Sequence, residues 1–262
     1  RGEVGEGGTR SRGGGQRGGA AKCPVPAFRR LSECGKGCGF ARNAWKGMAG
    51  MGWAVILIPE EFGVTGLGYL TLGLVLEETG RTLTASPLVS TALTATTALL
   101  IGGNDAQKKK YLPQIAEGKL IATLAVDEGP HHAPEKLALK VEKSGSGYKL
   151  NGKKSFVLDG GVADLIIVAA RTSGKPGEKG GITLFLVDGK ANGLSREKLK
   201  TVDSRGVANT TFNNVEVGAD AIIGSADQGD GVLEYTLARA RAGLAAEMLG
   251  PELRSCEVTL DY

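Results

Sequence analysis

The spacing of hydrophobic positions changes once along the chain, near Lys119, and this change predicts a helical region followed by a region of strands. Before Lys119 the apolar residues recur every three or four positions, as they do on one face of a helix. The pattern predicts a largely buried helix that begins near Gly68 and ends at Gly80, and a second helix from Ser86 to Ile101. We therefore expect the N-terminal part of the fold to be all-helical.

A third, short helix is predicted from the residues at its ends. Asn104 and Gln107 have the spacing of a capping box, in which each side chain bonds the main-chain amide of the other residue. The helix is expected to run through Ala116 and to close at Gly118. Pro113 is expected to break it, because proline removes one main-chain donor.

After Lys119 apolar and polar residues alternate, which is the period of a strand. Turn residues separate most of the predicted strands, and Gly145 to Gly147 is predicted to form a hairpin turn. The predicted strands are residues 121–126, 137–143, 147–150, 155–158, 165–171, 183–187, 195–199, 209–212 and 215–217. Many short strands without intervening helices are typical of a compact antiparallel barrel or sandwich.

Helix is predicted again at the end of the chain, from about Gly231. Its apolar stripe comprises Leu233, Leu237, Leu244, Ala245, Met248 and Leu249. Pro251 is expected to kink or stop this helix. The predicted fold class is α+β, with an N-terminal all-helical domain at 41–118, a small antiparallel β-barrel domain at 119–228 and the start of a C-terminal helical bundle at 229–262.

Residues 1–40 are Gly-rich and have almost no periodic apolar positions, so we expect this segment to be disordered. An RNA-binding tail is one interpretation of its composition, and a fragment boundary or an out-of-register translation is the other. The formal net charge is +4, and the basic excess lies in the first thirty positions. The remainder is close to neutral, so we expect no nucleic-acid partner.

The cysteines are Cys23, Cys34, Cys38 and Cys256. Three of them lie in the Gly-rich segment without a nearby histidine, which favours free reduced thiols in a cytoplasmic protein over a metal site. The longest apolar stretch, Ala85 to Ile101, is interrupted by threonine and serine, and no stretch reaches the roughly 18 residues that span a bilayer. We therefore predict a cytoplasmic protein with no metal and no membrane span.

The sequence contains no convincing nucleotide-binding fingerprint. Gly63, Gly66 and Gly68 do not make GxGxxG, and the phosphate loop GxxxxGK[ST] is absent. The two histidines, His131 and His132, are adjacent on a predicted loop, where neighbouring side chains point in different directions. We expect them to be exposed to solvent, and a ligand-facing role at a domain junction is the alternative.

Several sequence blocks together resemble the acyl-CoA dehydrogenase family over roughly Asn43 to Tyr262. They are PEEFG, LGLVLEETGR, QKKKYLPQIAEGK, GYKLNGKKSFVLDGGVADLIIVAART and TTFNNVEVGADAIIG. The resemblance implies that two strand ends hold the isoalloxazine ring of FAD, the first through Val126 and Asp127 and the second through Phe156, Val157 and Leu158. Phe156 would stack on the ring. The alternative for Phe156 is a core aromatic on an inward strand face.

The sequence departs from the family pattern at four positions. Of the family's Thr-Glu-Pro sequence only the glutamate is kept, as Glu128. Asp127 takes the place of the threonine and Gly129 that of the proline. Ala133 replaces a serine that would meet the pyrophosphate. Leu158 replaces a threonine that bonds the flavin, and its side chain cannot donate a hydrogen bond.

The resemblance implies oxidation of a fatty-acyl-CoA thioester to its 2,3-enoyl form, a step of lipid degradation. A carboxylate removes the α proton, FAD accepts the hydride, and an electron-transfer flavoprotein accepts the electrons. Full-length members work as homo- or hetero-oligomers. The family's catalytic glutamate lies in a C-terminal bundle of which this chain resembles only the first helix.

Neither Glu247 nor Glu252 matches that glutamate, so we assign no catalytic residue. We therefore expect a fragment that is inactive alone. The alternatives are a non-catalytic subunit of a heteromeric dehydrogenase and a flavin-free acyl-CoA-binding module.

Overall fold

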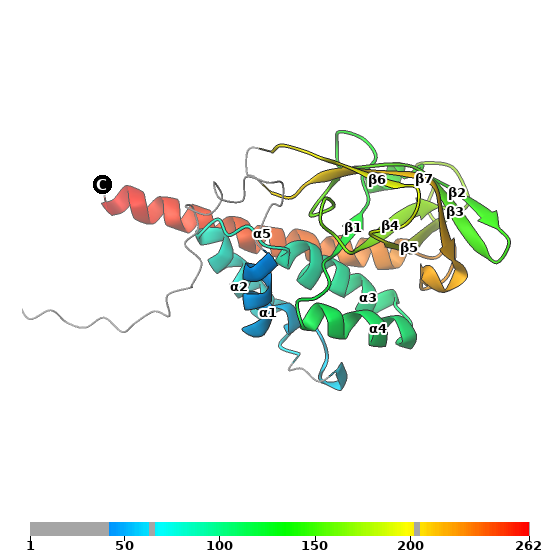
Figure 1. Ribbon diagram of the computed structural model, residues 1–262. Coiled ribbons are helices and arrows are strands. Elements are labelled where there is room, and N and C mark those ends of the chain that lie inside the picture. The colour runs from blue at the N-terminus through cyan, green and yellow to red at the C-terminus, as the bar shows by residue number, and fades with distance from the viewer. Residues whose placement is uncertain (1–41, 63–65, 202–204, 262) are drawn as a thin grey trace, which may run out of the picture.

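The computed structural model describes residues 42–62, 66–201 and 205–261 (Figure 1). The predicted disorder of residues 1–40 and three of the cysteines, Cys23, Cys34 and Cys38, lie outside the described residues. Along the described chain, helices come first, a sheet follows, and one long helix ends the fold.

The helical part consists of short elements around buried leucine, alanine and tryptophan side chains. Its elements are α1 (Arg42–Gly50), η1 (Trp53–Val55), η2 (Glu60–Phe62), α2 (Gly68–Arg81), η3 (Leu88–Ala95), α3 (Thr96–Gly102) and α4 (Asp105–Ala116). The second predicted helix is therefore η3, a π-helix, followed by α3. Threonine side chains follow the same five-residue spacing as the wider turn of a π-helix. The hydroxyls of Thr94 and Thr96 each donate to the main-chain carbonyl five residues earlier.

The capping box that opens α4 is confirmed. The Gln107 amide donates to Asn104 Oδ1 at 2.9 Å, and the Asn104 amide donates to Gln107 Oε1 at 3.1 Å. The predicted break at Pro113 is wrong, because α4 continues to Ala116. Pro113 removes only one donor, and the side chains of Leu112 and Ile115 on either side of it are buried and hold the turn against the core.

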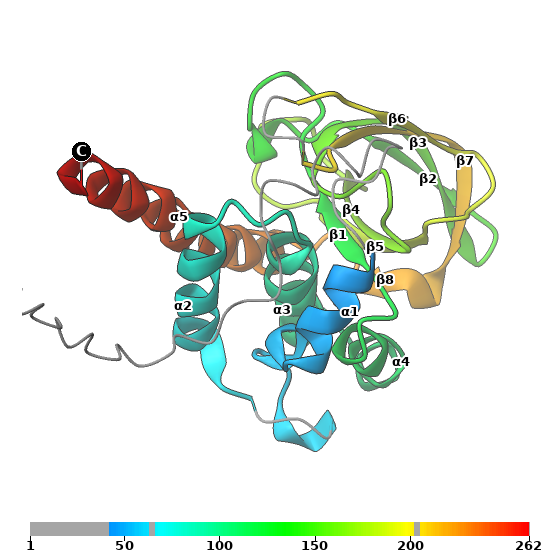
Figure 2. The same ribbon diagram turned by 60° about the vertical axis from the view of Figure 1, so that its left-hand side comes forward.

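In the described part of the chain, eight strands form one sheet. They are β1 (Ala122–Ala125), β2 (Lys140–Ser144), β3 (Gly147–Val157), β4 (Leu165–Arg171), β5 (Ile182–Asp188), β6 (Leu194–Lys198), β7 (Ala208–Gly218) and β8 (Ile222–Ile223). The order is β6-β7-β3-β2-β4-β5-β8, with β1 parallel to β4. The sheet curls strongly (Figure 2).

The predicted barrel is not confirmed, because the sheet is not closed: its end strands β6 and β8 do not pair in the described residues. The sheet is also mixed, since β4 runs parallel to both β1 and β2. Alternation along single strands could not reveal this difference, because it specifies which face is buried but not which strands are neighbours.

Two pairs of predicted strands are each one continuous strand in the structure. Predicted strands 147–150 and 155–158 together form β3, and predicted strands 209–212 and 215–217 together form β7. Asn151 and Gly152 resemble a turn in sequence, yet β3 runs through them with Gly152 at φ +146°. Asn214, at φ +51°, occupies the facing position on β7, and its amide donates to Asn151 Oδ1 at 2.8 Å. The turn-like residues of the two strands thus form one shared irregularity in a continuous ladder.

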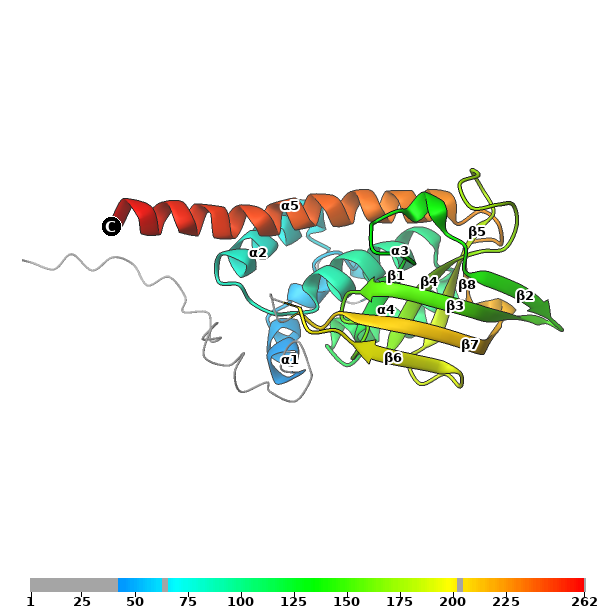
Figure 3. The same ribbon diagram turned by 90° about the horizontal axis from the view of Figure 1, so that it is seen from above.

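The final helix, α5 (Asp230–Asp261), runs along both the helical part and the sheet (Figure 3). Pro251 was predicted to kink or stop this helix, and it does not stop it, because α5 continues for ten more residues to Asp261. Its buried residues recur every three or four positions and are mostly small or polar: Leu233, Thr236, Ala240, Gly243, Glu247 and Gly250. Only Leu233 belongs to the predicted apolar stripe.

Small residues explain why α2 and α5 lie so close together. A Cβ atom on Gly250 would overlap the carbonyl oxygen of Glu77, and one on Gly80 would overlap the carbonyl oxygen of Glu247.

The helices of the described residues include none with the length and apolar character needed to span a membrane.

Candidate functional site

The ends of β1 and β3, which carry the five predicted site residues, lie side by side. The amide of Ser155 donates to the carbonyl of Asp127 at 2.7 Å. The hydroxyl of Thr123 donates to the carbonyl of Leu158 at 2.6 Å. The fold therefore brings Val126 and Asp127 next to the segment from Phe156 to Leu158, although about thirty residues separate them in sequence.

Phe156 lies on the surface, with 55 % of its area exposed, so the alternative of a core aromatic is wrong. Its φ is +53°, in the left-handed region, where a non-glycine residue carries roughly 1–3 kcal/mol of strain. The irregular pairing of β3 with β7 between Lys154 and Val157 imposes this conformation. Val157 is buried within the sheet core and Leu158 is half-buried against the helices.

Asp127 is occupied within its own loop. Its carboxylate accepts hydrogen bonds from His132 Nδ1 at 2.9 Å and from the amide of Ala133 at 3.0 Å. His132 Nε2 lies 3.4 Å from Nη2 of Arg241 on α5. Both histidines are exposed loop residues, as predicted, and His132 also connects this loop to the last helix.

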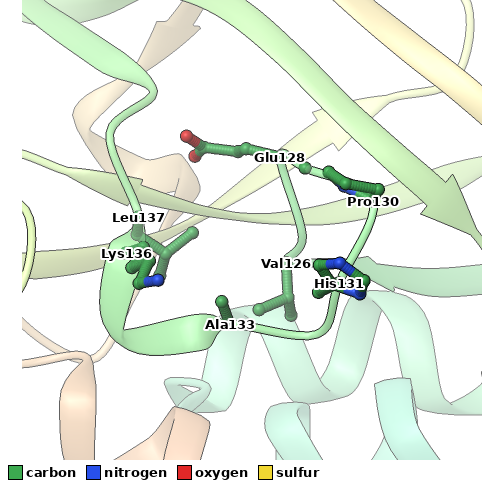
Figure 4. A pocket seen from close by; sticks show the side chains of 8 residues that line it. Val126, Glu128, Pro130, His131, Ala133, Lys136 and Leu137 are labelled. Carbon is green, nitrogen blue, oxygen red and sulfur yellow. The ribbon is translucent and has the colours of Figure 1, made fainter.

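A cavity of about 170 Å³ opens at the end of β1. It is lined by Val126, Glu128, Gly129, Pro130, His131, Ala133, Lys136 and Leu137 (Figure 4). A second cavity of about 290 Å³ lies between the same loop and α5, with Pro134, Leu237 and Arg241 among its lining residues. The loop after β1 thus separates two hollows.

Sequence analysis missed the most buried charge near these strand ends, Lys154. Its side chain has no exposed area, and its Nζ donates to Glu128 Oε1 at 2.6 Å and to the carbonyl of Val126 at 2.8 Å. Burial lowers the pKa of Lys154 to about 8, although the carboxylates of Glu128 and Asp127 oppose the shift. The adjacent pair Lys153 and Lys154 was the available signal, because neighbours on a strand face opposite sides.

A second polar network joins the sheet to the helices. The Ser90 hydroxyl of η3 donates to Asp159 Oδ2 at 2.6 Å, and Arg205 Nη2 donates to Glu247 Oε1 on α5 at 2.6 Å. Burial raises the pKa of Asp159 to about 6, opposed by the Ser90 hydrogen bond and by the charge of Arg205. Glu247 is thus held in an ion pair, whereas Glu252 is exposed to solvent.

Residues 42–62, 66–201 and 205–261 contain no group of three His, Cys, Asp or Glu side chains that could hold a metal ion. Cys256 is free and exposed on α5.

Two family models match the chain. "Acyl-CoA dehydrogenase, N-terminal domain" matches residues 25–119, and "Acyl-CoA dehydrogenase, middle domain" matches residues 131–215. The second match covers most of the loop after β1 and the strands from β2 to most of β7.

Curated relatives include the mitochondrial isovaleryl-CoA dehydrogenase of Pongo abelii, which is 36% identical over 234 residues. That alignment covers 84% of this chain and 54% of the relative. Cyclohex-1-ene-1-carbonyl-CoA dehydrogenase of Geobacter metallireducens is 37% identical over 202 residues, covering 74% of this chain and 52% of the relative. The chain therefore spans about half the length of the curated relatives that it matches.

Among solved structures, the one described as "PigA with FAD and proline" superposes with a TM-score of 0.77 at 26% sequence identity. The match covers 89% of this chain and 62% of that one.

Proposed function

Because the chain belongs to the acyl-CoA dehydrogenase family, we propose that it takes part in the oxidation of an acyl-CoA thioester to the 2,3-enoyl thioester, with FAD as the hydride acceptor. The observation that carries this proposal is Phe156, an exposed aromatic in a strained conformation beside the end of β1. Strained residues cluster at ligand sites, because the surrounding fold holds them in place for binding.

The residues at the two strand ends fit a flat aromatic ring better than they fit its polar edge. Phe156 offers an exposed face for stacking, and the main chain at Val126 and Val157 lies beside it. We call the surface formed by the five predicted site residues at the ends of β1 and β3 the proposed flavin wall. Leu158 has no side-chain donor, and the Asp127 carboxylate already accepts two hydrogen bonds from its loop. We propose that stacking and main-chain contacts hold the ring in this chain. FAD, when bound, supplies two-electron acceptance.

The proton removed from the substrate needs an acceptor within hydrogen-bond reach. Glu247 is a poor candidate, because Arg205 binds its carboxylate at 2.6 Å and the side chain is buried. Among the described residues we therefore propose no catalytic base. We propose an electron-transfer flavoprotein as the electron acceptor and an oligomeric assembly, as the family resemblance implies.

A second candidate function is a non-catalytic subunit of a heteromeric dehydrogenase. The observation that favours it is the hydrogen bond between His132 and Asp127. This contact holds the Asp127 side chain against its own loop, and we infer that the side chain is then not directed at the flavin. A catalytic and a non-catalytic chain differ in whether bound FAD is bleached when an acyl-CoA is added.

Titration of the protein with FAD tests the proposal. Quenching of flavin fluorescence measures affinity, and Phe156→Leu is expected to weaken binding about two- to tenfold, the value of one aromatic contact. Tyr69→Leu is the matched control, because Tyr69 is a partly exposed aromatic on α2, in the helical part. The proposal fails if the wild-type protein does not bind FAD, or if both variants weaken binding equally.

A further inference from the structure

Glu128 and Lys154 connect three separate segments of main chain at the proposed flavin wall. Lys154 Nζ binds the carbonyl of Val126 at the end of β1. The Glu128 carboxylate, which also binds Lys154, accepts the amides of Ala138 and Leu139 at 2.9 Å each. Figure 4 shows the Glu128 side chain on this loop, separate from His131. These four hydrogen bonds join the end of β1 to the segment before β2 through a side chain of β3.

The ammonium of Lys154 is the centre of this arrangement. Its side chain is fully buried, whereas that of Glu128 keeps 21% of its area exposed. The charges that face Lys154 are the carboxylates of Glu128 and Asp127, both from the segment after β1. On β7 its cross-strand neighbour is Thr210, whose buried hydroxyl has no hydrogen-bond partner in the part of the chain that the structure describes.

We infer that Lys154 is a positioning residue, whose ammonium holds the end of β1 and the loop after it in the place where they form the wall of the flavin site. The role at a flavin site rests on the proposed function. The two segments are also joined directly, because Ser155 donates to the carbonyls of Asp127 and Glu128. Lys154 adds the contacts that continue from this junction to the segment before β2. A neutral side chain at 154 would leave the Val126 carbonyl and one Glu128 oxygen without their common donor.

The same residue makes the loop sensitive to alkali. The pKa of Lys154 lies near 8 because burial disfavours its charged form. As the pH rises past this value the amine loses its charge, and with it the electrostatic attraction that strengthens its hydrogen bond to the Glu128 carboxylate. The amides of Ala138 and Leu139 then lose a carboxylate that is held in a fixed position.

Amide hydrogen exchange of the flavin-free protein tests the inference directly. In Lys154→Met we expect protection factors at Ala138, Leu139 and Ser155 to fall at least tenfold, while those of β4 stay unchanged. Thr210→Val is the matched control, because it alters the buried neighbour on β7 and removes no hydrogen bond seen in the described residues. In the wild-type protein the same three amides are expected to lose protection selectively between pH 7 and pH 9.5, which tests the inference even if the variant does not fold.

FAD affinity is then measured for wild type, Lys154→Met and Thr210→Val at pH 7, with an expected loss of at least fivefold in Lys154→Met alone. Unchanged exchange at these amides, in the variant and at high pH, would overturn the inference. So would altered exchange with unaltered FAD affinity, because the loop would then be held without positioning the site. Failure of the wild-type protein to bind FAD counts against the proposed function, and the exchange result still decides whether Lys154 holds the loop.

Discussion

The pH dependence of global stability gives a sharp test of the buried ammonium of Lys154. Its pKa falls from 10.5 to about 8 in the folded protein, so the folded state releases the proton first as the pH rises. The unfolded chain binds more protons between these two values, and the free energy of unfolding therefore increases with pH in that window. Burial of the charge is a penalty that is fully present below pH 8 and is relieved as the pH approaches 10.5.

One pKa unit corresponds to about 1.4 kcal/mol, so the shift from 10.5 to about 8 is of the order of 3 kcal/mol. Solvent screening does not reduce this value, because the side chain has no exposed area. Between pH 7 and pH 10, where the unfolded lysine is still mostly charged, we expect a relief of about 2 to 3 kcal/mol.

Urea unfolding of the wild type and Lys154→Met at several pH values between 7 and 10 measures this relief as a change in the difference between their unfolding free energies. Other groups that titrate in the window contribute equally to both proteins. Lys153→Met is the control, because it removes a half-exposed lysine beside Lys154 and leaves the buried ammonium in place. Parallel pH profiles for the wild type and Lys154→Met would refute the reasoning. The expected rise in global stability also distinguishes it from the local loss of amide protection, which has the opposite sign.

Three further predictions concern the contacts of α5 and of the buried carboxyl. The pKa of Asp159 is raised to about 6, so its contribution to the free energy of unfolding is present at low pH and is lost as the pH rises through 6. From pH 5 to pH 7 the free energy of unfolding of the wild type should fall by about 1 kcal/mol relative to that of Asp159→Asn, as measured by urea unfolding. Gly250→Ala should destabilise the fold by about 1–3 kcal/mol in thermal or urea unfolding, because its Cβ would overlap α2, whereas Gly231→Ala meets open space and should not. Leu244 and Met248 are 38% and 63% exposed, so light scattering should show self-association of the wild-type protein that the double change to Gln reduces; a monomeric wild type at high concentration would contradict this.

Local signals predicted those parts of the fold that local interactions determine. The capping box at Asn104 and Gln107 needs only residues three apart, and the structure contains both of its hydrogen bonds. The boundaries of β4, Leu165–Arg171, follow from a continuous apolar run and agree with the predicted strand. Proline and turn residues misled the prediction at Pro113, Pro251 and Asn151, because tertiary packing compensates there for a local preference.

Contacts between distant segments were out of reach of the sequence. The seam between α2 and α5 depends on glycines that an apolar stripe does not reveal, since a missing side chain contributes no hydrophobic signal. Sheet closure likewise depends on which strands become neighbours. The order of the strands puts β6 and β8 at opposite ends, and no pattern within either strand contains that information.

The candidate site shows the same division between residue identity and residue role. Glu128 matches the family pattern by identity, and the structure shows that its carboxylate accepts hydrogen bonds from two amides and an ammonium. Phe156 also matches as an aromatic, but its exposed, left-handed conformation depends on the irregular ladder between β3 and β7. Lys154 lies in the middle of these contacts, two residues before Phe156 in sequence and hydrogen-bonded to Glu128. A substitution at Lys154 should therefore alter the geometry of the proposed wall while every residue that faces the flavin stays the same, so that affinity and protection, and not residue identity, report whether the wall is intact.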